Sequence, residues 1–280
     1  MKKVMGILLT IALGLGIVGG ALAASEITVV SREAGSGTRG AFVELTGVEA
    51  KDADGKKVDM TYEDAIIQNG TAQVITTVEG DENAIGYISL GSLGDTVKAV
   101  TVGGVEATPE NVKNGSYSVA RPFNIAVKEG VSDTALDFIA WVLSAEGQQI
   151  VLGNKYVELD AVEYTAAPVA GKIVIGGSSS VGPLMEKLTE AYKAINADVE
   201  IEVQVSDSTT GMQGAIDGTF DIGMASRELK GSELEAGLIP TVIAMDGIAV
   251  IVNTANAIEN LEVEQIRQIF TGEVTEWDAL

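Results

Sequence analysis

Short runs rich in β-branched residues alternate with amphipathic stretches along almost the whole chain after residue 25. This alternation is typical of α/β folds, in which helices connect the strands of a sheet and cover its faces. We predict strands at residues 27–30, 84–89, 123–127, 172–175, 199–205, 220–225, 241–244 and 247–253, and helices at 135–151, 183–196 and 263–270. A length of 280 residues suits one large domain or two modest ones.

The helix predicted at 183–196 has the clearest pattern. Leu184, Leu188, Tyr192 and Ile195 recur at helical spacing along one stripe. In the strand predicted at 199–205 apolar and polar residues alternate, so we expect one of its faces to be in solvent. Residues 157–171 lack a clear periodicity, and we interpret them as a linker between two blocks.

The chain contains no cysteine and no histidine. Their absence excludes disulfides, thiolate chemistry, Ser-His-Asp and Cys-His triads, and metal sites that depend on Cys or His. The balance of 18 Lys and Arg against 40 Asp and Glu gives a net charge of −22. Nucleic acids and anionic lipids need basic surfaces, so we expect neither as a partner. A local group of donors could still hold a small anion.

The first 23 residues have the pattern of a secretory signal peptide. Lys2 and Lys3 precede an apolar run at 4–18, and Ala21 and Ala23 suit a cleavage site after residue 23. The alternative is an uncleaved membrane anchor, because the run is long enough to span a bilayer. No cysteine follows the run, so a lipid-anchored cysteine is impossible. We therefore expect an exported protein, periplasmic or extracellular, that is soluble once the signal is removed.

Three segments share one design: a strand, a loop rich in Ser, Thr and Gly, and then a helix. They lie at residues 29–40, 175–183 and 205–212. The first-turn N–H groups of a helix lack intrahelical partners and the helix dipole favours negative charge there, so such loops suit an anion. Each loop alone could equally be an ordinary helix cap. Arg32 in the first loop could bind an oxyanion through two hydrogen bonds, or could form an ion pair with Glu33.

These loops resemble motifs of the periplasmic phosphate-binding proteins, the solute receptors of high-affinity phosphate ABC importers. The most discriminating match is residues 32–38, which read Arg-Glu-Ala-Gly-Ser-Gly-Thr, followed by residues 177–181, which read Gly-Ser-Ser-Ser-Val. Further similar stretches lie at 84–89, 121–123, 221–228 and 245–250, so the likeness covers nearly all of residues 25–280. The resemblance implies the two-lobed periplasmic-binding-protein fold (type II), with two hinge crossovers and the anion between the lobes.

The order of the matching pieces departs from the family. Family members begin with the Gly-Ser-Ser-Ser-like loop and reach the Arg…Gly-Ser-Gly-Thr loop in mid-chain, whereas here the second half comes first. We interpret this order as a circular permutation, in which residues 157–171 join the old termini. One lobe would then be continuous, at 118–244, and the other split into 25–117 and 245–280. The alternative is a fragment of a longer tandem protein.

Carried over by position, the resemblance implies a set of ligand-binding residues on the two lobes. These are Arg32, Ser36, Gly37, Thr38, Ser180, Val181, Ser208 and Ser226. Ser180 and Val181 would donate backbone N–H groups, Ser208 would donate its hydroxyl and N–H, and residues 36–38 would wrap a helix N-terminus around the anion. Arg32 would supply the positive charge.

Ser226 stands where some family members carry an aspartate. A carboxylate only accepts hydrogen bonds, so it favours a protonated phosphate over sulfate, whereas a serine hydroxyl both donates and accepts. Asp207 and Asp246 are candidates for the missing carboxylate. Arg227 could add a second positive charge to the site, or could simply pair with Glu228.

The sequence therefore predicts a monomeric binding protein that captures inorganic phosphate and delivers it to the membrane permease of an ABC importer. It would need no cofactor and no metal, and it would have no catalytic residues. One alternative is a receptor for another tetrahedral oxyanion. A second is a metal-dependent phosphate-ester hydrolase, for which no clustered Asp and Glu spacing is evident. A third is an anion sensor or scavenger without a transport role.

Overall fold

The computed structural model describes residues 26–280, so the predicted signal peptide at 1–23 lies outside the described residues. The main sheet has nine strands, with β6 pairing on β12 beside the strand order β10-β9-β11-β8-β12-β5-β1-β4. Its strands are β1 (Thr28–Arg32), β4 (Ile66–Gln68), β5 (Ala84–Ser89), β6 (Val97–Ala99), β8 (Ala120–Lys128), β9 (Gly171–Ser178), β10 (Val199–Ser206), β11 (Ile222–Ala225) and β12 (Leu238–Asn253). Two small sheets pair β2 (Glu49–Lys51) with β3 (Lys57–Asp59) and β7 (Thr101–Val102) with β13 (Asn260–Leu261). The α/β fold class predicted from the sequence is confirmed.

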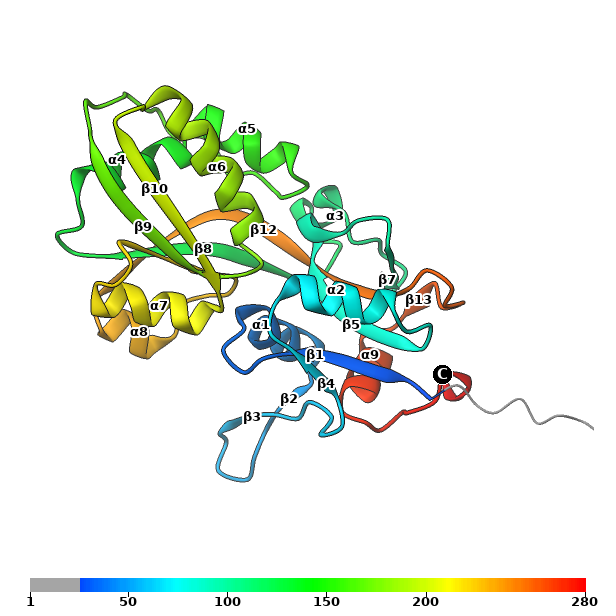
Figure 1. The fold of residues 1–280 in the computed structure, drawn as a ribbon. Helices are drawn as coiled ribbons and strands as arrows, with labels where there is room; N and C mark the ends of the chain where they lie inside the picture. The colour runs from blue at the N-terminus through cyan, green and yellow to red at the C-terminus, as the bar shows by residue number, and fades with distance from the viewer. Residues whose placement is uncertain (1–25) are drawn as a thin grey trace, which may run out of the picture.

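The helices are grouped on two lobes that β8 and β12 connect (Figure 1). The α1 lobe carries α1 (Gly37–Thr46), α2 (Thr71–Glu79), α3 (Pro109–Lys113) and α9 (Val263–Phe270). The α6 lobe carries α4 (Asp133–Val142), α5 (Ala145–Gly153), α6 (Gly182–Ile195), α7 (Ser208–Asp217) and α8 (Gly231–Glu235). Short 3₁₀ turns lie at Leu90–Ser92 and Trp277–Ala279. None of the helices within residues 26–280 combines the length and the apolar character needed to cross a membrane.

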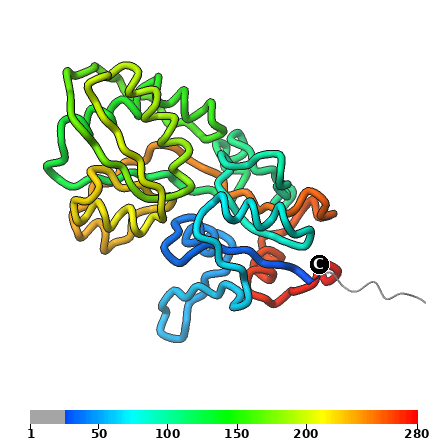
Figure 2. Tube along the Cα trace, in the orientation of Figure 1, coloured from blue at the N-terminus to red at the C-terminus, as the bar shows by residue number. Residues whose placement is uncertain are grey.

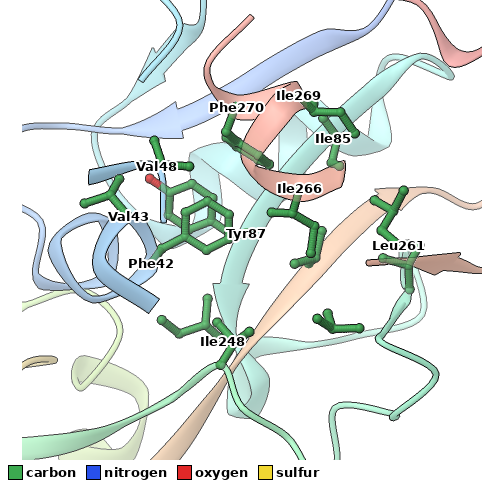
Figure 3. Packing of buried hydrophobic residues seen from close by; sticks show 14 of the residues in the cluster. Phe42, Val43, Val48, Ile85, Tyr87, Ile248, Leu261, Ile266, Ile269 and Phe270 are labelled. Atoms are coloured by element: carbon green, nitrogen blue, oxygen red, sulfur yellow. The ribbon is translucent and has the colours of Figure 1, made fainter. Parts of the chain in front are cut away.

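An aromatic cluster holds the α1 lobe together (Figure 3). The rings of Phe42 and Tyr87 stack with centroids 3.9 Å apart, and Phe270 packs edge-on against Phe42 at 4.8 Å. These residues come from α1, β5 and α9, so the core joins the beginning and the end of the described chain. Each such aromatic pair contributes roughly 0.5–1.5 kcal/mol beyond the area it buries.

The core of the α6 lobe includes the stripe predicted on its longest helix. Leu184, Leu188 and Tyr192 are fully buried and pack with strand residues such as Ile175. The prediction was wrong for Ile195, which is 59% exposed. Ile195 is the last residue of α6, where the chain turns away from the core at the C-cap.

Two predicted elements differ from the structure. The helix predicted at 135–151 is two helices, because Ser144 has an extended backbone and its side chain caps α5 by accepting from Gly147 N at 3.2 Å. The strands predicted at 241–244 and 247–253 form one strand, β12, which runs without interruption through Asp246. That charge is tolerated in a buried strand because Arg121 lies opposite it on β8.

The two ends of the described chain are neighbours, as the blue and red segments of Figure 2 show. Ile27 donates its N–H to the carbonyl of Thr275 at 2.7 Å, and Glu26 forms a β-bridge with Glu276. Residues 158–170 contain no helix or strand. They are nevertheless tied to the α6 lobe, where the Tyr164 hydroxyl donates to the Asp137 carboxylate at 3.0 Å.

Candidate functional site

The three loops predicted to hold an anion meet where the two lobes touch. The first follows β1 and leads into α1, the second follows β9 and leads into α6, and the third follows β10 and leads into α7. In the α6 lobe β9 lies between β10 and β11, parallel to both, so their carboxyl ends lie at one edge of the sheet. Ligands of open α/β sheets bind at such edges.

A network of hydroxyl groups joins the loops. The Thr38 hydroxyl of the α1 lobe lies 2.7 Å from the Ser180 hydroxyl and 3.4 Å from the Ser226 hydroxyl of the α6 lobe. Ser208 accepts from the backbone N–H of Ser226 at 3.1 Å, and Ser178 donates to the Ser226 hydroxyl at 2.9 Å. Ser226 is therefore at the centre of the network.

All eight predicted ligand residues are buried. Contacts across the lobes go beyond the hydroxyls, since the backbone N–H of Thr209 donates to the carbonyl of Gly35 at 3.2 Å. At Gly37 a Cβ atom would lie 2.4 Å from the Ser208 hydroxyl oxygen, so only glycine allows this approach. The lobes are thus closed on each other over the hydroxyl network.

Arg32 is buried at the end of β1 and is 2% exposed. Its Nε and Nη2 atoms donate to the two carboxylate oxygens of Glu33 at 2.8 and 2.7 Å. Nη2 also donates to the Ser179 hydroxyl at 3.1 Å, while Nη1 is buried without a hydrogen-bond partner. The pair with Glu33 considered from the sequence forms, but the guanidinium is buried and directed at the opposite lobe.

The start of α1 supplies further donors, whereas the expected donors at the start of α6 are bonded within their own loop. Ser36 caps α1 by accepting from Arg39 N at 3.3 Å, which leaves Gly37 and Thr38 at the first two positions, whose N–H groups have no intrahelical partner. Val181 caps α6 without a side-chain bond. The N–H groups of Val181 and Ser180, expected from the sequence to donate to the anion, instead donate to the Ser178 carbonyl at 3.1 Å and the Ser178 hydroxyl at 3.3 Å. The Val181 side chain lies in the core of the α6 lobe.

Neither candidate for a replacement carboxylate bonds to the hydroxyl network, although the Asp207 carboxylate lies against Gly35 of the first loop. Asp207 caps α7 and accepts from the N–H and hydroxyl of Thr210 at 2.9 and 2.6 Å. Asp246 is fully buried on β12, where it pairs with Arg121 at 3.0 Å and accepts from the Ser89 hydroxyl at 3.0 Å. Burial raises the pKa of the Asp246 carboxyl to about 6, although the charge of Arg121 opposes this shift.

Arg227 binds neither the hydroxyl network nor the carboxylate of Glu228. Its guanidinium forms two hydrogen bonds with the Glu233 carboxylate, at 2.9 and 2.7 Å, and one with the Glu228 backbone carbonyl at 2.9 Å. The pairing with the Glu228 carboxylate considered from the sequence was therefore wrong. The second positive charge beside the site stays a prediction, and Nη2 also reaches the Thr209 hydroxyl of the third loop at 3.5 Å. Within residues 26–280 no group of three or more acidic side chains lies close enough together to hold a metal ion.

Sequence reasoning missed three hydroxyl residues. Ser178 and Ser179 stand in the same loop as Ser180, and their serine identity was the available signal. Thr71 begins α2, a helix not predicted because its run from Val74 to Val78 consists of β-branched residues that favour strands. The spacing of the buried Thr71, Val74 and Val78 by three and four positions was the signal for that helix.

The chain is similar to known phosphate-binding proteins. A model described as a PBP superfamily domain matches residues 16–146 and 162–280. The phosphate-binding protein PstS 2 of Streptococcus agalactiae serotype V is 50% identical over 276 residues, which cover 96% of this chain and 94% of that protein. A crystal structure of a phosphate ABC transporter, phosphate-binding protein from Streptococcus pneumoniae TIGR4 is 46% identical, with a TM-score of 0.71 over 91% of this chain and 99% of that chain.

A more distant relative matches only in part. The phosphate-binding protein PstS of Borreliella burgdorferi is 32% identical over 107 residues, which make up 38% of this chain and 38% of that protein.

Proposed function

This chain belongs to the phosphate-binding proteins of the PBP superfamily, and we propose that it captures inorganic phosphate between its two lobes and delivers it to the permease of an ABC importer. It acts as a binding protein and not as an enzyme. The relatives that match along nearly their whole length carry the name phosphate-binding protein, and one is described as part of a phosphate ABC transporter.

The observation that carries the proposal is the network of hydroxyl groups from both lobes beside the buried Arg32. The predicted set Arg32, Ser36, Gly37, Thr38, Ser180, Val181, Ser208 and Ser226 would act together. The hydroxyls of Thr38 and Ser180 now bond to each other at 2.7 Å, and a tetrahedral anion would replace this bond with two bonds to its oxygens. Hydrogen bonds to a charged group are worth about 1.5–3 kcal/mol each, so this exchange favours the bound state.

Binding at the boundary of two lobes also explains how a permease would recognise loading. The anion contacts Thr38 of the α1 lobe and Ser180 of the α6 lobe together only when the lobes are closed. Its differential affinity therefore shifts the population toward the closed form. We further propose that the protein is exported by the signal peptide at 1–23 and works as a monomer.

We further propose that the chain is circularly permuted with respect to family members of the other order, whereas the relatives that match along nearly their whole length share the order seen here. The neighbouring ends at Ile27 and Thr275 and the linker at 157–171 are the arrangement that a permuted chain requires. An alignment that runs in sequence order matches only one half of a relative with the other order, and the Borreliella burgdorferi relative matches over 38% of its length. In this proposal 118–244 is the continuous lobe, and 25–117 with 245–280 is the split lobe.

Ser226 favours a second candidate, a receptor for tetrahedral oxyanions in general. Its hydroxyl can donate to a fully ionised sulfate, so the site lacks the acceptor-only group that would reject sulfate.

Calorimetric titration of residues 24–280, first unfolded and refolded to remove bound ligand, tests both candidates. We expect one phosphate to bind per chain, and the same titration in excess sulfate separates the candidates. Binding indifferent to sulfate supports the phosphate receptor, whereas binding abolished by sulfate supports the broader receptor. A folded protein that binds neither anion would contradict both.

A further inference from the structure

Thr71 holds a position at the candidate site that the family resemblance does not assign. The strand β4 pairs in parallel with β1, with Gln68 in register with Arg32, so the chain leaves β4 beside the end of β1. Gly70 then turns the chain into α2 with a φ of 134°, a backbone conformation that favours glycine. Thr71 is the first residue of that helix and is 5% exposed.

The Thr71 hydroxyl faces the opposite lobe. It lies 3.3 Å from the hydroxyl of Ser180, a predicted ligand residue, and 3.5 Å from the hydroxyl of Ser179. Arg32 donates to the same Ser179 hydroxyl at 3.1 Å. Thr71 and Arg32 therefore reach the same loop of the α6 lobe side by side.

One buried donor at this point has no protein acceptor, and the uncapped start of α2 lies near it. The cap residue of α2 is a glycine, and no side chain caps the helix. The Nη1 atom of Arg32 is buried without a hydrogen-bond partner. Buried donors of this kind are rare in folded proteins unless a ligand or water accepts from them. The space in front of Thr71 thus offers an anion donors in addition to the hydroxyl network.

Beyond Thr71 lies a groove of about 510 Å³ between the starts of α2 and α6. Thr71 and Ser179 both line this groove, and both also contact residues of the hydroxyl network or Arg32. These two side chains therefore form the wall between the groove and the buried network.

We propose that Thr71 is a further residue of the phosphate site. Together with Ser179, Thr71 would close the site on the side of the groove and keep the bound anion from leaving. This inference rests on the proposed function. Phosphate would leave through the groove once the lobes open, and the Thr71 hydroxyl would have to break its contacts with the Ser179–Ser180 loop first. Removal of that hydroxyl should then speed release of phosphate more than it slows capture.

The test compares Thr71→Val, Thr71→Ser and the parent chain by titration with phosphate and by release of radiolabelled phosphate into excess unlabelled phosphate. Valine keeps the shape of threonine but lacks the hydroxyl, so we expect affinity to fall and release to accelerate by about 2- to 10-fold. Serine keeps the hydroxyl and should restore both values. Thr76→Val is the matched control, because Thr76 is exposed on the same helix and its hydroxyl donates to the Ala72 carbonyl of that helix.

Thermal unfolding checks that each variant is folded. If Thr71→Val does not fold, Ser179→Ala removes the partner hydroxyl on the other lobe and tests the same contact. A Thr71→Val protein that binds and releases phosphate like Thr76→Val would overturn this inference and leave the proposed function intact. Failure of serine to restore what valine loses would overturn it as well. A folded parent chain that binds no phosphate would refute the proposed function, and this inference with it.

Discussion

At the scale of single residues, the charge of the site is already balanced before a ligand arrives. Arg32 forms two hydrogen bonds with Glu33, so the formal charge of this buried pair is zero. The remaining groups around Ser226 are neutral hydroxyls, from Thr38, Ser178 and Ser208. Hydroxyls rotate to donate or accept as needed, so the number of donors, rather than a fixed charge, determines which anion is held.

This account predicts that Ser226→Asp makes the site selective. The new carboxylate would accept a hydrogen bond from the O–H of hydrogen phosphate. A fully ionised sulfate has no O–H to donate, so its oxygen would meet the carboxylate as an unbridged like charge, which costs several kcal/mol. We expect sulfate affinity to fall at least about 100-fold, with a much smaller change for phosphate. Competition titrations measure the ratio.

Ser226→Asn is the matched control, because asparagine has the shape of aspartate without its charge. It should leave the ratio of phosphate to sulfate affinity close to that of the parent chain. If Ser226→Asp binds sulfate as the parent does, the hydroxyl at 226 does not face the ligand.

Much of the site could be predicted at this scale because its residues stand in three short loops with distinctive composition. The structure brings the predicted hydroxyls of Thr38, Ser180, Ser208 and Ser226 into one network. Thr71 could not be found in that way, since its contact with Ser180 spans 109 positions in the chain. Neither could the pairing of Arg227 with Glu233, because the neighbouring Glu228 was the acid visible in the sequence.

At the scale of helices and strands, local pattern predicted elements well where one face is buried. The limits of β5 and α9 agree with the prediction. The local sequence pattern did not predict the ends of elements that depend on contacts between distant residues. Asp246 would end an isolated strand, yet β12 continues because Arg121 neutralises it from β8. Ser144 looks like a helix interior residue, yet it caps a second helix.

The proposed circular permutation can be tested by joining the two ends of the chain and opening it at another place. Consider a chain that runs from residue 168 to 280, continues through a short linker into residue 26 and ends at 167. Its pieces would stand in the order that the sequence resemblance assigns to other family members. Because Ile27 already pairs with Thr275 and residues 158–170 form no regular element, we expect it to fold and to bind phosphate like the parent. Thermal unfolding and titration measure this.

A chain joined in the same way but opened in the exposed turn at 52–55 is the control for the new linker. If the control folds and the chain opened at 167–168 does not, the linker at 157–171 is essential to the fold. That result would contradict the interpretation that it merely joins two old termini.

At the scale of the whole molecule, closure depends on how the two crossover strands are held. Arg121 on β8 and Asp246 on β12 form a buried ion pair where both strands pass between the lobes, with side chains 2% and 0% exposed. Burial lowers the pKa of the Arg121 guanidinium, although the Asp246 charge opposes the shift. The pair thus holds the strands in register at the hinge, while the contacts of Thr38 and Arg32 with the α6 lobe hold the closed form.

The most direct test of the central claim is a crystal structure of residues 24–280 grown with phosphate after the protein has been unfolded and refolded. We predict one tetrahedral anion between the lobes, within hydrogen-bond distance of Arg32 and Thr38 on one side and of Ser180 and Ser226 on the other. Phosphate bound elsewhere, for example in the cavity of about 630 Å³ that Arg227 and Lys230 line, would contradict the account. So would closed lobes with the Thr38–Ser180 hydroxyl bond intact and no anion between them.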